Sequence, residues 1–371
     1  MARKLELGHS SSTTTSSPHR QFSVQHMSSQ SALWLTEKQG SFALGPKEIP
    51  TPGPGEILVK IHSAGLNPID WKIAAFGFLV EDYPAVLGNE AAGTVEAVGE
   101  GVANVVEGDK VFFQGPMDNR GAAFQQYAVA PAAVASKIPP NISFDEAAAL
   151  SVGIATAVIP LYSQSPVGIG YQAPWDGGRG KYSGQPIVVL GGASSVGQYV
   201  IQLARLSGFS PIIATASPHN SALLASLGAT HVLDRNLPFS AIADEISKIT
   251  AVPVGLVYST VALPDVQQGG YDVLAPGGHI VLVSTSSINP REGDGKKIVG
   301  VFGSWHAPGN AAFGSAVAPE LTKLLADGDI VPAAVEVVPG GLGGVVAGLE
   351  RLKSDQVSAK KLVVRPWETV L

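Results

Sequence analysis

The sequence predicts an α/β protein of two domains, one of them a doubly wound parallel sheet. Its 371 residues fit about two domains on the usual scale of roughly 100 to 200 residues each. Between residues 186 and 284, short apolar runs alternate with segments of helical periodicity. The segment before residue 160 instead contains short strands joined by Gly and Asp turns. We therefore expect a β-rich domain beside a domain in which helices cover both faces of a parallel sheet.

The strands and helices of the α/β domain can be assigned in order. Residues 186–191 (PIVVLG) read as a strand buried on both faces, and apolar residues then recur at helical spacing up to Gly208. Residues 211–217 (PIIATAS) form the second strand, a second helical stripe ends at Gly228, and THVLD starts a third strand. Two further strands, GLVYST and HIVLVS, extend this β-α-β-α-β unit.

The chain after about residue 303 contains a helix (320–326), a strand (334–338), another helix (342–352) and a closing strand, KLVVRP. We expect this tail to return to the β-rich domain.

The composition indicates a globular protein, with 45% hydrophobic and 15% charged residues. The net charge of -6 and the lack of a basic stripe argue against partners such as nucleic acids or anionic membranes. The sequence has no cysteine, which excludes disulfides, zinc-thiolate sites, iron-sulfur clusters and a cysteine nucleophile. The most apolar stretch, residues 147–161, falls short of the about 20 residues that a membrane span needs. We expect a soluble, cytoplasmic protein.

Residues 1–31 are polar and rich in Ser and Thr, so we expect a disordered tail. The tail lacks the apolar segment of a secretory signal. Arg3, Lys4 and Arg20 against a single Glu6 resemble a mitochondrial transit peptide weakly. We favour the other interpretation, a simple tail or an upstream start codon with Met27 as the functional beginning.

The loop LGGASSVGQ, residues 190–198, joins the first strand to the first helix of the α/β domain. Doubly wound sheets bind ligands at the carboxyl ends of their strands, where this loop lies. The dinucleotide fingerprint has three glycines: the first allows a tight turn, the second lets the pyrophosphate approach the backbone, and the third lets helix and strand pack closely. In this sequence Gly192 and Gly197 occupy the first and third places, and Ser194 occupies the second. Despite the incomplete motif, its setting indicates a cofactor loop, with the residues Gly191, Gly192, Ala193, Ser194, Ser195, Val196 and Gly197.

The end of the second strand indicates which dinucleotide would bind. A carboxylate there would bind the ribose 2′-hydroxyl of NAD and repel a 2′-phosphate. The sequence instead has Ser217, Pro218, His219 and Asn220, which offer hydrogen-bond donors at a helix N-terminus. We therefore expect NADPH as the cofactor. Arg235 could reach the adenosine end, or it could be an ordinary surface charge.

Several segments together resemble a known superfamily. PGPGEILVKIHSAGLNPIDWK, YPAVLGNEAAGTVEAVGEGV, EGDKVF, GGASSVGQYVIQLARLSG, LGATHVLD, LAPGGHIVLV and VSAKKLVV follow, in order, the landmarks of the medium-chain dehydrogenase/reductases over about residues 32 to 366. NPIDWK, ASPHN and the insertion at 165–184 resemble a narrower group, the fungal zinc-free branch with trans-acting enoyl reductases and ToxD-like oxidoreductases. The resemblance implies a GroES-like catalytic domain, residues 32–160 and 305–371, around a Rossmann NADPH-binding domain, residues 161–304.

The sequence departs from the zinc-dependent members of that superfamily. Zinc alcohol dehydrogenases place a cysteine at or near Asn67, and Gly-His-Glu where this chain has Gly88-Asn89-Glu90. Without these ligands we expect no metal in the site. The chemistry that remains is NADPH-dependent reduction of a carbon-carbon double bond conjugated to a carbonyl, with hydride delivered to the β-carbon and a proton to the α-carbon.

The resemblance also implies which residues form the site. Lys72 and Thr156 are the candidate catalytic residues, with Lys72 as a hydrogen-bond donor or proton source. Asn67, Asp70 and Trp71 would lie beside the nicotinamide ribose. The C-terminal pair Val357 and Ser358 would close on the cofactor, and the substrate would be lined by Leu150, Ser151, Val152, Gly153, Val299, Gly300, Val301, Phe302 and Gly303.

Several of these positions have a purely structural interpretation too. Lys72 could be a surface lysine, Asp70 a helix cap and Thr156 a hydroxyl bonded to a helix carbonyl. Residues 299–303 are equally compatible with an ordinary buried strand.

Three functions stay open on the sequence. The first is a trans-acting enoyl reductase that acts on an acyl chain tethered to a polyketide synthase, as a monomer or homodimer. The second is a free-standing NADPH quinone or alkenal reductase. The third is an NADPH-binding protein without turnover.

Overall fold

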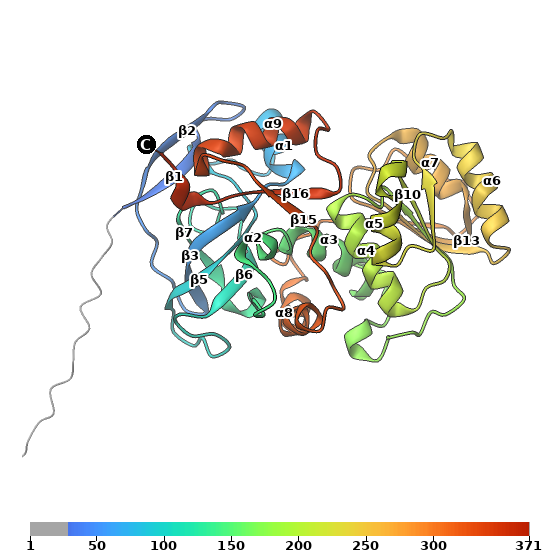
Figure 1. Ribbon diagram of the computed structural model, residues 1–371, viewed down its shortest axis with the longest axis horizontal. Helices are drawn as coiled ribbons and strands as arrows, with labels where there is room; N and C mark the ends of the chain where they lie inside the picture. Colours follow the sequence, from blue (N-terminus) through green and yellow to red (C-terminus); the bar gives the residue numbers. More distant parts are fainter. Residues whose placement is uncertain (1–28, 371) are drawn as a thin grey trace, which may run out of the picture.

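The computed structural model describes residues 29–370, which fold into two lobes that lie side by side (Figure 1). The first and last parts of the described chain form one lobe, and the middle part forms the other. The tail predicted at 1–31 lies outside the described residues except at its end, where a strand already begins at Gln30. That end is not disordered, because the buried Gln30 amide bonds both the N–H and the carbonyl of Tyr127, at 2.6 and 3.1 Å.

The first lobe, called here the β-rich lobe, contains two sheets. The smaller has the order β2-β1-β4, and the larger has the order β15-β16-β3-β5-β6-β8 with β7 paired to β3. The strands are β1 (Gln30–Leu35), β2 (Phe42–Lys47), β3 (Glu56–Gly65), β4 (Ala85–Val86), β5 (Glu90–Val98), β6 (Lys110–Gln114), β7 (Tyr127–Pro131), β8 (Ser136–Lys137), β15 (Ala334–Val337) and β16 (Lys360–Val364). The C-terminal strand β16 pairs with β3, so the chain does return to the first lobe.

The second lobe, the α/β lobe, is one six-stranded parallel sheet of order β11-β10-β9-β12-β13-β14. Its strands are β9 (Ile187–Leu190), β10 (Ile212–Ala216), β11 (His231–Asp234), β12 (Val254–Ser259), β13 (Leu274–Leu282) and β14 (Lys297–Gly300). The order reverses between β9 and β12, and the crevice at this point is where doubly wound folds bind ligands.

Nine α-helices lie in the described part of the chain: α1 (Pro68–Phe76), α2 (Phe144–Ala147), α3 (Ser151–Tyr162), α4 (Ser195–Ser207), α5 (Ser221–Leu227), α6 (Phe239–Ile249), α7 (Pro264–Asp272), α8 (Ala311–Ala326) and α9 (Val345–Lys353). Short 3₁₀ turns include η1 (Ala132–Val134) and η3 (Pro218–Asn220). Within residues 29–370, none of these helices has the length and apolarity to cross a membrane.

Helices cover both faces of the parallel sheet, as the continuous apolar strands predict. Side chains alternate along β9, so Ile187 and Val189 pack in the core with α3, α4 and α5, whereas Val188 and Leu190 pack with α6 and α7. The core on the α3 side continues into the β-rich lobe and includes Val363 of β16. The two lobes therefore share one hydrophobic core, and the exact domain boundaries at residues 160 and 304 stay a prediction.

Candidate active site

The glycine loop after β9 is shaped for a close approach between backbone segments. Gly191 has φ +82°, in the left-handed region that favours glycine. A methyl group on Gly197 would lie 2.5 Å from the carbonyl oxygen of Gly191 and 2.8 Å from the Cα of Gly192. The first turn of α4 thus packs directly on the loop, which is the role of the third glycine in the dinucleotide fingerprint.

Ser194 takes a different role from the glycine that the fingerprint has at its middle place. It is the N-cap of α4: its Oγ accepts the N–H of Gly197 at 3.0 Å and donates to Oγ1 of Thr260 at 3.0 Å. The hydroxyl is engaged in these two bonds, and a helix N-terminus such as that of α4 favours an anion such as a pyrophosphate. Thr260, which follows β12, was not among the predicted site residues.

The expected 2′-phosphate pocket brings together residues from both lobes. The η3 turn, formed by Pro218, His219 and Asn220, follows Ser217 at the end of β10. Asn220 Nδ2 donates to Ser358 Oγ at 3.2 Å, and His219 Nε2 lies 3.4 Å from the same oxygen. Polar side chains of the α/β lobe therefore meet one residue of the β-rich lobe here.

Two charged residues flank this pocket at the end of β11. Arg235 is exposed, and its backbone N–H donates to the carbonyl of Ala216 at 2.9 Å, which places it beside the end of β10. Asp234 pairs in register with Ala216, and its carboxylate accepts the N–H of Asn236 at 3.0 Å. An acid is thus present on the neighbouring strand, but it is engaged in its own turn.

The C-terminal segment that supplies Ser358 has an unusual backbone. Asp355 and Ala359, two residues that are not glycine, have φ values of +53° and +54°. Such conformations persist where the surroundings enforce them and are frequent at ligand sites. Of the predicted pair, Ser358 reaches the α/β lobe, whereas Val357 is partly buried against the core of the β-rich lobe.

In the β-rich lobe, the start of α1 is held by a buried carboxylate. Asp70 is fully buried, and its two oxygens accept the backbone N–H of Asn67 at 2.8 Å and the Nδ2 of Asn89 at 2.7 Å. Burial raises the pKa of Asp70 to about 7. These bonds match the structural interpretation of Asp70 as a helix cap; its contact with the cofactor stays a prediction.

A buried ion pair lies beside Asn67. Lys361 Nζ is 2.5 Å from Glu90 Oε1 and donates to Asn67 Oδ1 at 2.6 Å. Glu90 Oε1 also accepts Asn67 Nδ2 at 2.9 Å, and Glu90 Oε2 accepts the N–H of Val152 at 2.7 Å. Sequence reasoning did not single out Lys361, although it lies only three residues after Ser358.

Four of the expected substrate residues, 150–153, form the N-cap and the first turn of α3. Leu150 and Ser151 are buried, and a methyl group on Gly153 would lie 3.7 Å from Ser195 Oγ, so this turn is next to the glycine loop. Thr156 Oγ1 donates to the carbonyl of Val152 at 2.7 Å, which is the structural role considered for it.

The segment after β14 meets the same helix. Gly303 lies so close to Thr156 that a methyl group there would overlap Thr156 Oγ1. Gln114, a buried residue that the sequence reasoning missed, donates to the Gly303 carbonyl at 2.8 Å and accepts the N–H of Trp305 at 2.9 Å. Of the other predicted residues, Val299 and Val301 pack on the shared core and Phe302 is 49% exposed. Residues 299–303 are therefore not a fully buried strand.

Lys72 and Trp71 lie on α1, next to the cluster around Asn67. Lys72 is half-buried, and its Nζ is 5.7 Å from the ring centroid of Trp71. The Trp71 Nε1 atom is buried and has no hydrogen-bond partner among residues 29–370. Trp71 therefore has a free donor, and the catalytic role of Lys72 stays a prediction.

No metal-binding cluster of three or more His, Cys, Asp or Glu side chains occurs in the described part of the chain. The two amides, Asn67 and Asn89, at or near the positions of zinc ligands in the zinc-dependent relatives, bond to carboxylates instead.

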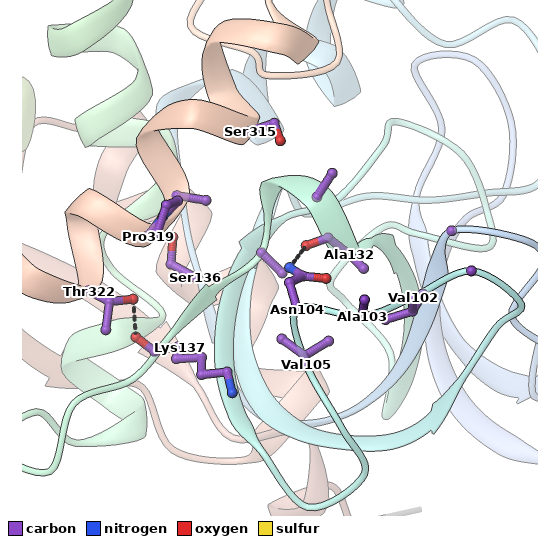
Figure 2. Close-up of a pocket in the computed structure, with 15 residues that line it drawn as sticks. Val102, Ala103, Asn104, Val105, Ala132, Ser136, Lys137, Ser315, Pro319 and Thr322 are labelled. Atoms are coloured by element: carbon purple, nitrogen blue, oxygen red, sulfur yellow. Dashed lines mark hydrogen bonds between the residues drawn. The ribbon is translucent and has the colours of Figure 1, made fainter.

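A cavity of about 510 Å³ lies apart from these residues (Figure 2). Its walls come from the loop 101–105, from η1, from β8 and from one side of α8. None of the residues discussed above lines it. The site at the glycine loop and the α1–α3 cluster stays a prediction from the sequence.

Comparisons with known proteins agree with this architecture. Residues 53–140 match the alcohol dehydrogenase GroES-like domain, and residues 195–304 match the zinc-binding dehydrogenase domain. Trans-enoyl reductases of a Penicillium species and of Gibberella fujikuroi are each 31% identical to the chain, over 85% of its length and 92% and 93% of theirs. A crotonyl-CoA carboxylase/reductase variant solved in complex with NADP superposes with a TM-score of 0.73 at 18% identity, over 91% of this chain and 95% of that one. The chain therefore belongs to the medium-chain dehydrogenase/reductase superfamily of oxidoreductases.

Proposed function

We propose that the protein reduces the carbon-carbon double bond of an α,β-unsaturated thioester with NADPH, as a trans-acting enoyl reductase of a polyketide pathway. The observation that carries this proposal is the 31% identity to fungal trans-enoyl reductases over most of both chains. The proposed reaction site lies between the glycine loop and the α1–α3 cluster. The cytoplasmic location expected from the sequence stays a prediction.

The chain's own residues fit a dinucleotide at this site. Gly197 leaves no room for a side chain, so α4 packs closely on the glycine loop, as the third glycine of the dinucleotide fingerprint allows. When bound, NADPH supplies the hydride. The residues around it bind and orient the two reactants and exclude water. Lys72 and Thr156 remain the candidates to stabilise the enolate oxygen or supply the proton.

The choice of NADPH over NADH rests on the pocket around Ser217. No carboxylate stands at the end of β10, and the side chains of His219 and Asn220 converge on Ser358 Oγ. The Ser217→Asp variant places a negative charge there, and we expect its Kd for NADPH to rise while its Kd for NADH falls or stays constant. Ser247→Asp, on the exposed side of α6, adds the same charge elsewhere and is the control. Unchanged cofactor preference in Ser217→Asp would contradict the assignment.

The reaction is tested by following NADPH absorbance with a panel of acceptors. We expect turnover with enoyl thioesters, and a higher kcat/KM when the same acyl group is attached to a carrier domain than when it is attached to a small thiol. Equal or better turnover of quinones and small alkenals would favour a free-standing reductase. NADPH binding without turnover of any acceptor would leave a non-catalytic protein.

A further inference from the structure

The ion pair between Lys361 and Glu90 is almost fully removed from solvent. The side chain of Lys361 is 6% exposed and that of Glu90 is 0% exposed. The preceding residue on the same strand, Lys360, forms a very different pair. Its Nζ lies 3.0 Å from Glu336 Oε2, and the two side chains are 45% and 34% exposed. The strand β16 thus directs one lysine outward and its neighbour into the core.

Stability alone does not account for a pair at this depth. Desolvation of two buried charges offsets much of their attraction, and apolar replacements are often as stable. In some proteins a buried pair is retained because it fixes a specific geometry, and the other bonds of this pair indicate which groups it would fix.

The first group that the pair fixes is the side-chain amide of Asn67. Lys361 donates to the oxygen of this amide, and Glu90 accepts from its nitrogen, at 2.6 and 2.9 Å. The reversed amide would face an ammonium with its N–H group and a carboxylate with its oxygen, so only one orientation is stable. The amide nitrogen carries two hydrogens, and these two bonds use only one of them. Asn67 is the N-cap of α1, three residues before Asp70 and four before Trp71.

The second group is the first turn of α3. The other carboxylate oxygen of Glu90 accepts the N–H of Val152 at 2.7 Å, and the carbonyl of Val152 accepts the hydroxyl of Thr156 at 2.7 Å. Glu90 therefore connects the turn that carries Thr156 to the same ammonium that holds Asn67.

We propose that Lys361 and Glu90 are positioning residues of the reductase: their ion pair holds the Asn67 amide in one orientation and fixes the α3 turn that carries Thr156. Both elements are thereby held in one arrangement relative to each other. The inference rests on the proposed function for its effect on turnover, but the ion pair and the placement of the cofactor can be measured without an acceptor.

The test compares Lys361→Met, Glu90→Gln, the double variant, Lys361→Arg and the control Lys360→Met. Three quantities are measured: the urea midpoint of unfolding, the emission and Kd of bound NADPH, and kcat and KM with the preferred acceptor. Each single variant leaves a buried charge or amide without its partner, and the double variant removes both charges.

We expect Lys361→Met and Glu90→Gln to lower the urea midpoint and the double variant to recover most of that loss. In contrast, kcat should fall about tenfold or more in Lys361→Met and stay low in the double variant, while KM changes less than kcat. The emission of bound NADPH should change with kcat, because the environment of the nicotinamide changes. Lys361→Arg should retain more activity than Lys361→Met, and Lys360→Met should match the wild type.

Two results would overturn the inference. If kcat and NADPH emission recover together with the urea midpoint in the double variant, the pair serves stability alone. If Lys361→Met folds and matches the wild type in emission and kcat, the pair positions nothing. If the wild type reduces no acceptor, the proposed function fails, and the emission of bound NADPH across the same variants still decides whether the pair positions the cofactor.

Discussion

The contact between α4 and the glycine loop leads to the sharpest prediction, which concerns Gly197→Ala. The added methyl group would lie 2.5 Å from the Gly191 carbonyl oxygen and 2.8 Å from the Gly192 Cα. Both are backbone atoms, so no flexible side chain can move aside. Ordinary van der Waals contact begins at 3.4 Å, and the methyl group would lie only 2.5 Å from the carbonyl oxygen. To relieve this overlap, α4 and the loop must separate by the difference, about 0.9 Å.

Such a shift moves the first N–H groups of α4 away from the place of the pyrophosphate. A hydrogen bond to a charged group contributes about 1.5–3 kcal/mol, and about 1.4 kcal/mol corresponds to a factor of ten. Loss of one such bond therefore raises the Kd for NADPH about 10- to 100-fold. Overpacking also lowers the free energy of unfolding by about 1–3 kcal/mol.

The assay is titration of the protein with NADPH, followed by nucleotide fluorescence, beside urea unfolding of the same samples. Gly255→Ala is the matched control, because a methyl group at Gly255 in β12 meets no atom within 4 Å. We expect it to bind NADPH as the wild type does. A Gly197→Ala variant that is folded and binds NADPH with wild-type affinity would refute the placement of the cofactor on this loop.

Three further predictions concern charge, the substrate segment and the surface. Burial raises the pKa of Asp70 from 3.8 to about 7, so between these values the folded state binds more protons than the unfolded state. The free energy of unfolding should therefore fall as the pH rises through this window, and urea titrations at several pH values should show a flatter dependence in Asp70→Asn. Gln114→Leu removes two bonds to the segment that begins at Gly303, and we expect a loss of about 1–3 kcal/mol in unfolding and a KM for the acceptor that rises more than the Kd for NADPH; an unchanged KM would contradict this. Arg179→Ala breaks an exposed ion pair with Asp329, and thermal unfolding should register a change below about 1 kcal/mol.

Local patterns in the sequence were sufficient for the parallel sheet and its glycine loop. The alternation of buried strands and helical stripes is a property of neighbouring residues, and it predicts β9 to β13 within a few positions, although β13 begins five residues earlier than expected. Where tertiary packing overrides the local pattern, the prediction falls short. Helix α8 begins at Ala311, not at 320, because Gly314 and Pro319 weaken the helical pattern. A methyl group on Gly314 would lie 3.0 Å from the Trp305 ring, so the glycine lets the helix pack closely there.

The ion pair of the candidate site could not be predicted from local patterns. Glu90 and Lys361 are far apart in the chain, and lysine is rarely buried. The segment KKLVV nevertheless indicated a buried lysine. Successive side chains of a strand point to opposite faces, so two consecutive lysines cannot both lie on the same face. Which face is the core depends on the pairing of β16 with β3, and that requires the structure.

Ser358 reaches Asn220 from the opposite lobe, so the pocket that would distinguish the two coenzymes is assembled from two separate stretches of chain. A chimaera that receives only residues 185–304 from a relative with the other preference would keep its old Ser358. We therefore expect that exchanging the Rossmann domain alone does not transfer the preference for NADPH or NADH, and that residues 355–359 must be exchanged as well.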